Sequence, residues 1–153
     1  MKVTATQLNR FLVFKLPAAF ISGVRVRKLT ETESIVTVRH RWINQNPFKS
    51  LYFAVQSMAA ELSTAAFLIK KIADSGEKIS MLVTYHKGSF TKKATGLITF
   101  SCTDVALLDE TIKRAIETKE GQTILMKSVG RNEDLEQVSE YEFEWSIKVR
   151  AKV

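Results

Sequence analysis

The chain has 153 residues, of which 45% are hydrophobic and 25% are charged, and its formal net charge is +7. This balance is typical of one compact domain, here expected to span residues 1–153, and excludes a disordered tail, a collagen-like repeat and a disulfide scaffold. Cys102 is the only cysteine, so we expect no cysteine zinc site and a reducing, cytoplasmic location. The basic residues are spread along the chain, which favours anionic partners or simply a solvated basic surface.

The first third of the chain predicts a short helix and two strands. Apolar residues near the start are bracketed by Arg10 and Lys15, so we expect neither a signal peptide nor a membrane span. An amphipathic helix is expected over about residues 6–16, ended by Pro17, with one more turn at 18–21. Strands should follow at 24–27 and 34–43, joined by a hairpin turn at 30–33. In the second strand one apolar face should hold Val36, Val38, His40 and Trp42.

A long helix is predicted next, over about residues 47–73. Asn46 is a good N-cap, Pro47 suits the first helical position, and Gly76 lies just beyond the expected end. Between Ser50 and Ile69 the only charged residue is Glu61. A helix with so little charge is buried on most sides, and a carboxylate in it costs free energy unless it is paired, hydrated or protonated. Glu61 is therefore a functional group with a raised pKa, or it pairs with an arginine or faces water at an edge.

The rest of the chain predicts one helix and four strands. The helix, over residues 104–118, carries Val105, Leu108, Ile112 and Ile116 at helical spacing. We expect the strands at 79–90 and 94–102 to form one pair, and those at 122–130 and 138–149 to form another. The sequence thus predicts an α+β fold with about six strands and one central helix.

The order of these elements resembles the hotdog fold, and the likeness extends to residues. The stretch Asn46–Ala54, followed by Ala59–Thr64, is similar to a thioesterase-like hotdog family of largely undefined function. The resemblance implies a curved antiparallel sheet around the helix and a homodimer or dimer of dimers with a cleft between subunits. In phenylacetate-pathway type relatives a His-Gly-Gly motif opens the helix and an acidic residue follows about two turns later. Here Tyr52 occupies the histidine place, Ala54 a glycine place and Glu61 the acidic place.

What the resemblance implies is hydrolysis of an acyl-CoA thioester. Glu61 would be the general base or position the water, Ser57 and Thr64 would orient it, and backbone amides of residues 46–50 would bind the oxyanion. Coenzyme A would be part of the substrate, and we expect no other cofactor. No metal site is expected, because the two histidines are far apart. The expected substrate-binding residues are Asn46, Ser50, Tyr52, Ala54, and, for the phosphates of coenzyme A, Lys92 and Lys93.

Other interpretations stay open. The absent His-Gly-Gly favours a non-catalytic hotdog module that holds an acyl thioester or another apolar ligand. A helix-grip lipid-binding domain would place its long helix at the C-terminus, whereas this chain is expected to end in a strand. His40 is expected to be a core residue and His86 a surface residue. Arg39 and Arg41 alternate on one strand face, but without a recognition helix the sequence does not indicate specific nucleic-acid binding.

Overall fold

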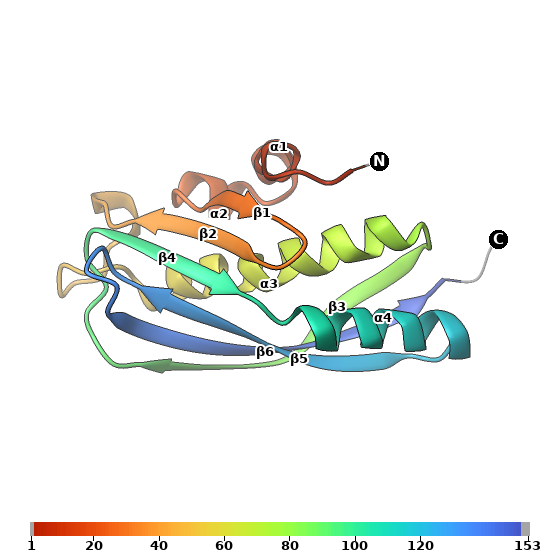
Figure 1. Cartoon of the computed structure of the whole chain (residues 1–153). Coiled ribbons are helices and arrows are strands. Elements are labelled where there is room, and N and C mark those ends of the chain that lie inside the picture. The colour runs from red at the N-terminus through yellow and green to blue at the C-terminus, as the bar shows by residue number, and fades with distance from the viewer. Residues whose placement is uncertain (1, 151–153) are drawn as a thin grey trace.

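The computed structural model describes residues 2–150, in which a curved six-stranded sheet wraps one long helix (Figure 1). All strand pairs are antiparallel, and the order across the sheet is β1-β2-β4-β5-β6-β3. The α+β class and the central helix predicted from the sequence are therefore confirmed. Along the chain the elements are α1 (Ala5–Lys15), α2 (Pro17–Ile21), β1 (Arg25–Leu29), β2 (Ser34–Arg39), η1 (Trp42–Asn44), α3 (Phe53–Ser75), β3 (Ile79–Phe90), β4 (Leu97–Cys102), α4 (Val105–Thr118), β5 (Gln122–Arg131) and β6 (Gln137–Val149).

The core lies between α3 and the concave face of the sheet. On β6, alternate side chains point inward and are buried, as the two-residue period of a strand requires. Polar groups on the buried side of α3 find partners: the Trp145 indole donates to Thr64 Oγ1 at 3.0 Å, and the Ser63 and Ser128 hydroxyls lie 2.7 Å apart. The helix is thus held by apolar packing and by specific hydrogen bonds to β5 and β6. The inward residues of β6 are Tyr141, Phe143, Trp145 and Ile147.

The beginning of α3 differs from the prediction. The helix starts at Phe53, and Pro47 lies in a turn rather than in its first position. Asn46 closes that turn, because its Oδ1 accepts hydrogen bonds from the Phe48 and Ser50 amides at 2.9 and 3.2 Å. At the other end Gly76 adopts a left-handed conformation with φ of 71° and ends the helix, as expected.

Two further predictions about strands are wrong. The second strand ends at Arg39 rather than residue 43, and Trp42, expected in the core, is 84% exposed in η1. The reason is Asn44, whose side chain binds the Arg41 amide and the carbonyls of Ser22 and Arg39, and so turns the chain away from the sheet. The strands at 79–90 and 94–102 do not pair with each other either. β3 pairs with β6, and β4 lies between β2 and β5, whereas the predicted pairing of β5 with β6 is confirmed.

The two edge strands of the sheet differ in whether another element covers them. At the β1 edge, the Asn9 side chain donates to the Val26 carbonyl at 2.8 Å and accepts from the Val26 amide at 2.9 Å, so α1 covers this edge. At the other edge, β3 carries twelve residues, and its second half from Thr84 to Phe90 is exposed. Such an open strand is a template for pairing with another strand.

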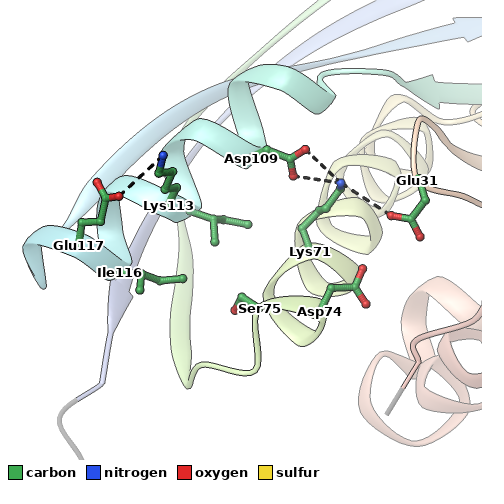
Figure 2. Close-up of a pocket in the computed structure, with 9 residues that line it drawn as sticks. Glu31, Lys71, Asp74, Ser75, Asp109, Lys113, Ile116 and Glu117 are labelled. Carbon is green, nitrogen blue, oxygen red and sulfur yellow. Dashed lines mark hydrogen bonds and ion pairs between the residues drawn. The ribbon is translucent and has the colours of Figure 1, made fainter.

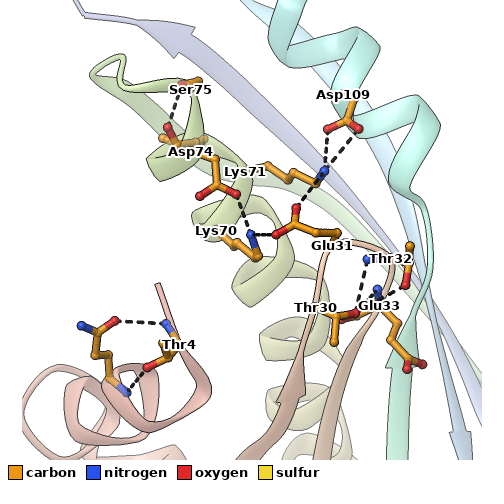
Figure 3. Close-up of polar contacts among 12 residues, drawn as sticks. Thr4, Thr30, Glu31, Thr32, Glu33, Lys70, Lys71, Asp74, Ser75 and Asp109 are labelled. Atoms are coloured by element: carbon orange, nitrogen blue, oxygen red, sulfur yellow. Dashed lines mark hydrogen bonds and ion pairs between the residues drawn. The ribbon is translucent and has the colours of Figure 1, made fainter. Parts of the chain in front are cut away.

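A network of ion pairs joins the C-terminal end of α3 to its surroundings (Figure 3). Lys70, which is buried, donates to Glu31 at 2.5 Å and to Asp74 at 2.6 Å. Burial alone would lower the pKa of Lys70, but its hydrogen bonds to Asp74 and Glu31 outweigh that effect and raise it. Since Glu31 lies in the β1–β2 turn, the network anchors this hairpin to α3. Within residues 2–150, no helix has the length and apolar character required to cross a membrane.

Candidate functional site

A pocket of about 540 Å³ lies at the start of α3, and we call it the Tyr52 pocket. It is formed by the turn before α3, the first turns of that helix and the segment that follows β3. Five of the six predicted substrate-binding residues line it, and Ala54 does not. Its lining residues are Asn46, Pro47, Phe48, Ser50, Leu51, Tyr52, Phe53, Gln56, Phe90, Thr91, Lys92, Lys93 and Ala94.

The backbone amides of the turn before α3 donate hydrogen bonds within that turn. Besides the two amides bound by the Asn46 side chain, the Asn46 amide donates to the Ser50 carbonyl and the Lys49 amide to the Asn46 carbonyl. Lys49 takes a left-handed φ of 57° to close the turn. The four amides of residues 46–50, expected to stabilise an oxyanion, are therefore all occupied, because the Asn46 side chain makes a local turn instead of a helix cap.

Free amides are found instead at the start of α3. In an α-helix the first N–H groups have no carbonyl of their own helix to bind. In α3 the first intrahelical acceptor is the Tyr52 carbonyl, which receives the Val55 and Gln56 amides. The amides of Phe53 and Ala54 have no acceptor among residues 2–150. They point along the positive end of the helix dipole, beside the Tyr52 pocket, so they are suited to bind a negative or polarised oxygen.

The two lysines of the pocket differ in their contacts. The Lys92 ammonium forms an ion pair with Glu136 at 2.7 Å. The Lys93 ammonium donates to the Phe48 carbonyl at 3.3 Å, and it has no carboxylate partner among the described residues. Lys93 is therefore the more available cation for a phosphate at this pocket.

Sequence reasoning missed Gln56. This buried side chain lines the pocket, and its Oε1 accepts from the Ser139 hydroxyl at 2.9 Å. The only sequence signal is an amide on an otherwise apolar side of the helix. The aromatic residues around it also pack edge-to-face on one another. The centroid of the Phe53 ring lies 5.0 Å from that of Tyr52 and 6.3 Å from that of Phe90. The pocket thus has an aromatic wall and one fixed buried amide.

Glu61 lies in a different hollow, of about 270 Å³, which we call the Glu61 cavity. Burial raises the pKa of Glu61 from 4.5 to about 7, and no cation of residues 2–150 pairs with its carboxylate. A carboxyl group with a pKa near 7 is suited to exchange protons at neutral pH. The cavity is otherwise apolar except for one lysine, and its lining residues are Lys15, Leu16, Pro17, Ala18, Ala19, Met58, Glu61 and Leu62.

Ser57 and Thr64, expected to orient Glu61 or its water, have other partners. The Ser57 hydroxyl lies 3.1 Å from the Phe53 carbonyl and 3.3 Å from the Tyr141 hydroxyl. The Thr64 hydroxyl donates to the backbone carbonyl of Glu61 and accepts from Trp145. These contacts turn both hydroxyls toward the sheet and the helix backbone. Neither hydroxyl forms a hydrogen bond with the Glu61 carboxylate.

A third hollow, of about 450 Å³, lies between the end of α3 and α4 (Figure 2). Its charged groups bind one another: Lys71 reaches Asp109 at 3.0 Å and Glu31 at 3.8 Å, and Lys113 lies 3.9 Å from Glu117. Because these charges are already paired, the hollow is a structural junction between α3, α4 and the β1–β2 turn.

The remaining groups that could carry chemistry are not assembled into a site. Cys102 is buried, which raises its pKa to about 12, so it is not a nucleophile at neutral pH. His86 is exposed on β3, as expected, while His40 is only partly buried just after β2. Within residues 2–150, no group of three or more metal-binding side chains comes together.

A curved antiparallel sheet wrapped around one long helix defines the hotdog fold, and solved structures share this arrangement. A Pseudomonas aeruginosa protein of unknown function, described as a "probable thioesterase", aligns with a TM-score of 0.83 at 20% identity over 98% of this chain and 99% of its own. A thioesterase from Haemophilus influenzae aligns with a TM-score of 0.76 at 13% identity, over 99% and 95% of the two chains.

Other hotdog neighbours have no assigned activity. A protein of unknown function from Chlorobaculum tepidum aligns with a TM-score of 0.84 at 15% identity, over 97% and 99% of the chains. At these identities the likeness shows the fold and not the reaction. No protein-family model matches the chain, and no curated protein matches it by sequence.

Proposed function

We propose that the protein is an acyl-CoA thioesterase that acts as a cytoplasmic homodimer or dimer of dimers. The observation that carries the proposal is Glu61, an unpaired carboxylate that is the only charged residue between Ser50 and Ile69 and whose pKa of about 7 suits a general base. The hotdog neighbours that are called thioesterases support the reaction class.

In the proposed reaction, Glu61 takes a proton from water as the water oxygen attacks the thioester carbonyl. The carbonyl oxygen becomes negative and is bound by the amides of Phe53 and Ala54, which lack acceptors. The intermediate then breaks its carbon–sulfur bond, and the coenzyme A sulfur receives the proton held by Glu61. The products are a carboxylic acid and the free thiol. Lys93 would bind a phosphate of coenzyme A.

The two halves of this machinery occupy separate hollows in one chain, since Glu61 does not line the Tyr52 pocket. A dimer formed through the open β3 edge would give each Tyr52 pocket a second wall from the partner chain. The proposal therefore assigns the amides of one subunit and the Glu61 of the other to one active site.

Release of free thiol from acyl-CoA substrates of increasing chain length tests the reaction. Glu61→Gln should lower kcat by about 10²–10⁴-fold while substrate binding persists, the usual contribution of a positioned acid–base group. Glu110 has an exposed carboxylate on α4, so Glu110→Gln is the matched control and should leave kcat unchanged. The rate of the unmutated protein should increase with pH around a midpoint near 7, because only the ionised Glu61 accepts a proton.

The oxyanion contact is tested by a proline. Phe53 is the first residue of α3, where proline is tolerated, and Tyr52 before it has φ of −62° and ψ of 134°, which a following proline accepts. Phe53→Pro should therefore keep the fold, remove one N–H and lower kcat by about 10²-fold or more. Phe53→Ala is the control, because it removes the same ring and keeps the amide.

A mixed dimer tests whether two subunits share one site. Glu61→Gln and Phe53→Pro chains carrying different affinity tags should each be inactive as homodimers. The heterodimer should recover up to about half the activity, because one of its two sites combines an intact amide with an intact Glu61. An inactive heterodimer would place both groups in the same subunit.

The alternative function is a non-catalytic module that binds an acyl thioester. Tyr52, Phe53 and Ala54 in place of His-Gly-Gly favour it, because the Phe53 side chain stands where glycine would leave the backbone open. Binding of acyl-CoA by the unmutated protein without any thiol release would establish this function and exclude the enzyme.

A further inference from the structure

The charge of the chain is divided unequally between its two parts. Lysines and arginines occur throughout, whereas the first acidic residue is Glu31. Residues 1–60 hold nine basic and two acidic residues and so carry the entire net charge of +7, while residues 61–153 hold 14 of each. The N-terminal elements are therefore a strongly basic part of an otherwise balanced molecule.

Large apolar side chains are exposed in these same elements. On α1, Leu8 and Leu12 are buried in the core, but Phe14 is 81% exposed. Ile21 at the end of α2 is 62% exposed, and Trp42 in η1 is 84% exposed. Exposed groups of this size on three elements that lie near one another are typical of an interaction surface, whereas apolar residues scattered singly are typical of an ordinary surface.

The structure holds α1, α2 and η1 together. α1 and α2 pack on each other, and the Asn44 amide of η1 donates to the Ser22 carbonyl at the end of α2 at 2.9 Å. These elements lie on the β1 side of the sheet, opposite the open β3 edge (Figure 1). We call this surface the N-terminal face and define it by three apolar residues, Phe14, Ile21 and Trp42, and three basic ones, Arg10, Lys15 and Arg41.

The positive charge of this region is not neutralised locally. Burial lowers the pKa of Arg25, and the nearby positive charges of Arg41 and Arg27 lower it further. Among the described residues no carboxylate forms an ion pair with Arg10, Lys15 or these three arginines. Unpaired cations beside exposed apolar groups are complementary to a partner that is both anionic and apolar.

We propose that the N-terminal face docks on an anionic lipid bilayer. The basic side chains would bind lipid phosphates, and Phe14, Ile21 and Trp42 would enter the boundary between headgroups and acyl chains, where tryptophan is favoured. A nucleic acid would match the charge but leave the aliphatic Ile21 without a partner.

The proposal is tested by cosedimentation of the full chain with phosphatidylcholine vesicles, with and without about one third phosphatidylglycerol. Binding should be at least about tenfold tighter to the anionic vesicles and should weaken as salt screens the charges. Trp42 fluorescence should shift to shorter wavelength on binding, whereas Trp145 is buried and should not respond. None of these measurements depends on thioester hydrolysis, so they are independent of the proposed reaction.

The variant Phe14→Ser, Ile21→Ser, Trp42→Ser should lose about tenfold or more in vesicle binding while keeping its circular dichroism spectrum, because all three side chains are exposed. The matched control replaces three exposed leucines from the part of the chain without net charge, Leu107, Leu125 and Leu135, by serine and should bind like the unmutated chain. Arg10→Glu with Lys15→Glu is a second variant that leaves the apolar groups in place, and it should lose binding to anionic vesicles alone.

Four results would overturn the proposal. Equal binding to vesicles with and without phosphatidylglycerol would remove the charge argument. Unchanged vesicle binding by the triple serine variant would show that these apolar groups do not touch lipid. A change of oligomeric state in that variant without vesicles, or double-stranded DNA displacing the unmutated chain from vesicles, would assign the face to a second copy or to nucleic acid.

Discussion

Replacing Glu61 by glutamine should make the protein more stable at pH 8 and leave its stability at pH 4 almost unchanged. The cause is that burial raises the pKa of this carboxyl group from 4.5 to about 7 in the folded chain. Between these two values the unfolded chain is ionised while the folded chain keeps its proton. The folded state binds more protons, so the stability due to this group is complete below pH 4.5 and is lost as the pH rises through 7.

The size of the effect follows from the same values. A tenfold change in an acid dissociation constant corresponds to about 1.4 kcal/mol. A rise in pKa from 4.5 to about 7 therefore costs up to about 3 kcal/mol at pH 8, and somewhat less because water reaches part of the Glu61 side chain. Glutamine has nearly the same volume and no charge to desolvate, so Glu61→Gln should recover about 2–3 kcal/mol at pH 8 and less than about 0.5 kcal/mol at pH 4.

Urea unfolding of the unmutated protein and of Glu61→Gln at pH 4, 6 and 8 measures this difference directly. Glu110→Gln, with an exposed carboxylate, is the control and should change stability by less than about 0.5 kcal/mol at every pH. If Glu61→Gln instead lost several kcal/mol at pH 8, a cation would have to pair with Glu61, because removing one partner strands the other charge. That result would refute the argument from uncompensated burial.

Urea unfolding also tests three predictions about packing. Leu62→Ala should cost about 2–5 kcal/mol, because the side chain is buried on α3, and a loss below about 0.5 kcal/mol would mean that α3 is not a core helix. Lys70→Ala should cost about 3 kcal/mol through lost packing and two lost ion pairs, and Lys70→Met, which keeps the volume, should cost less; equal losses would exclude a packing contribution. Asn9→Ala should cost about 1–3 kcal/mol by leaving both backbone groups of Val26 unpaired, and no loss would mean that water replaces the amide. Sedimentation should show a dimer at micromolar concentration, and a stable monomer would contradict pairing through the β3 edge.

Some features of this protein are determined by local sequence. The alternation of Tyr141, Phe143, Trp145 and Ile147 requires a strand with one buried face, whatever it pairs with. Gly76 ends α3 because glycine adopts the left-handed conformation at little cost. The isolation of Glu61 in an apolar helix indicates its raised pKa, since burial affects a carboxylate in the same way in any fold.

Other features depend on contacts between distant segments. Asn46 can cap a helix or close a turn with the same side-chain oxygen, and here the turn forms because the amides of Leu51 and Tyr52 bind the carbonyls of Ala94 and Asn44. A helix from residue 47 would forfeit those two bonds. The Phe53 and Ala54 amides, rather than those of residues 46–50, are free for this reason.

The neighbours of β3 and of Glu61 were likewise decided only by the tertiary structure. Strand pattern identifies a buried face but not a partner, so β3 next to β6 follows from how the sheet closes around α3. Lys15 to Ala19 lie far from Glu61 in sequence, and only the packing of α2 on α3 brings them into one cavity. The local sequence thus determined the buried strand face, the end of α3 and the direction of the Glu61 pKa shift. Tertiary packing decided which distant segments lie side by side, because their pairing depends on the whole core.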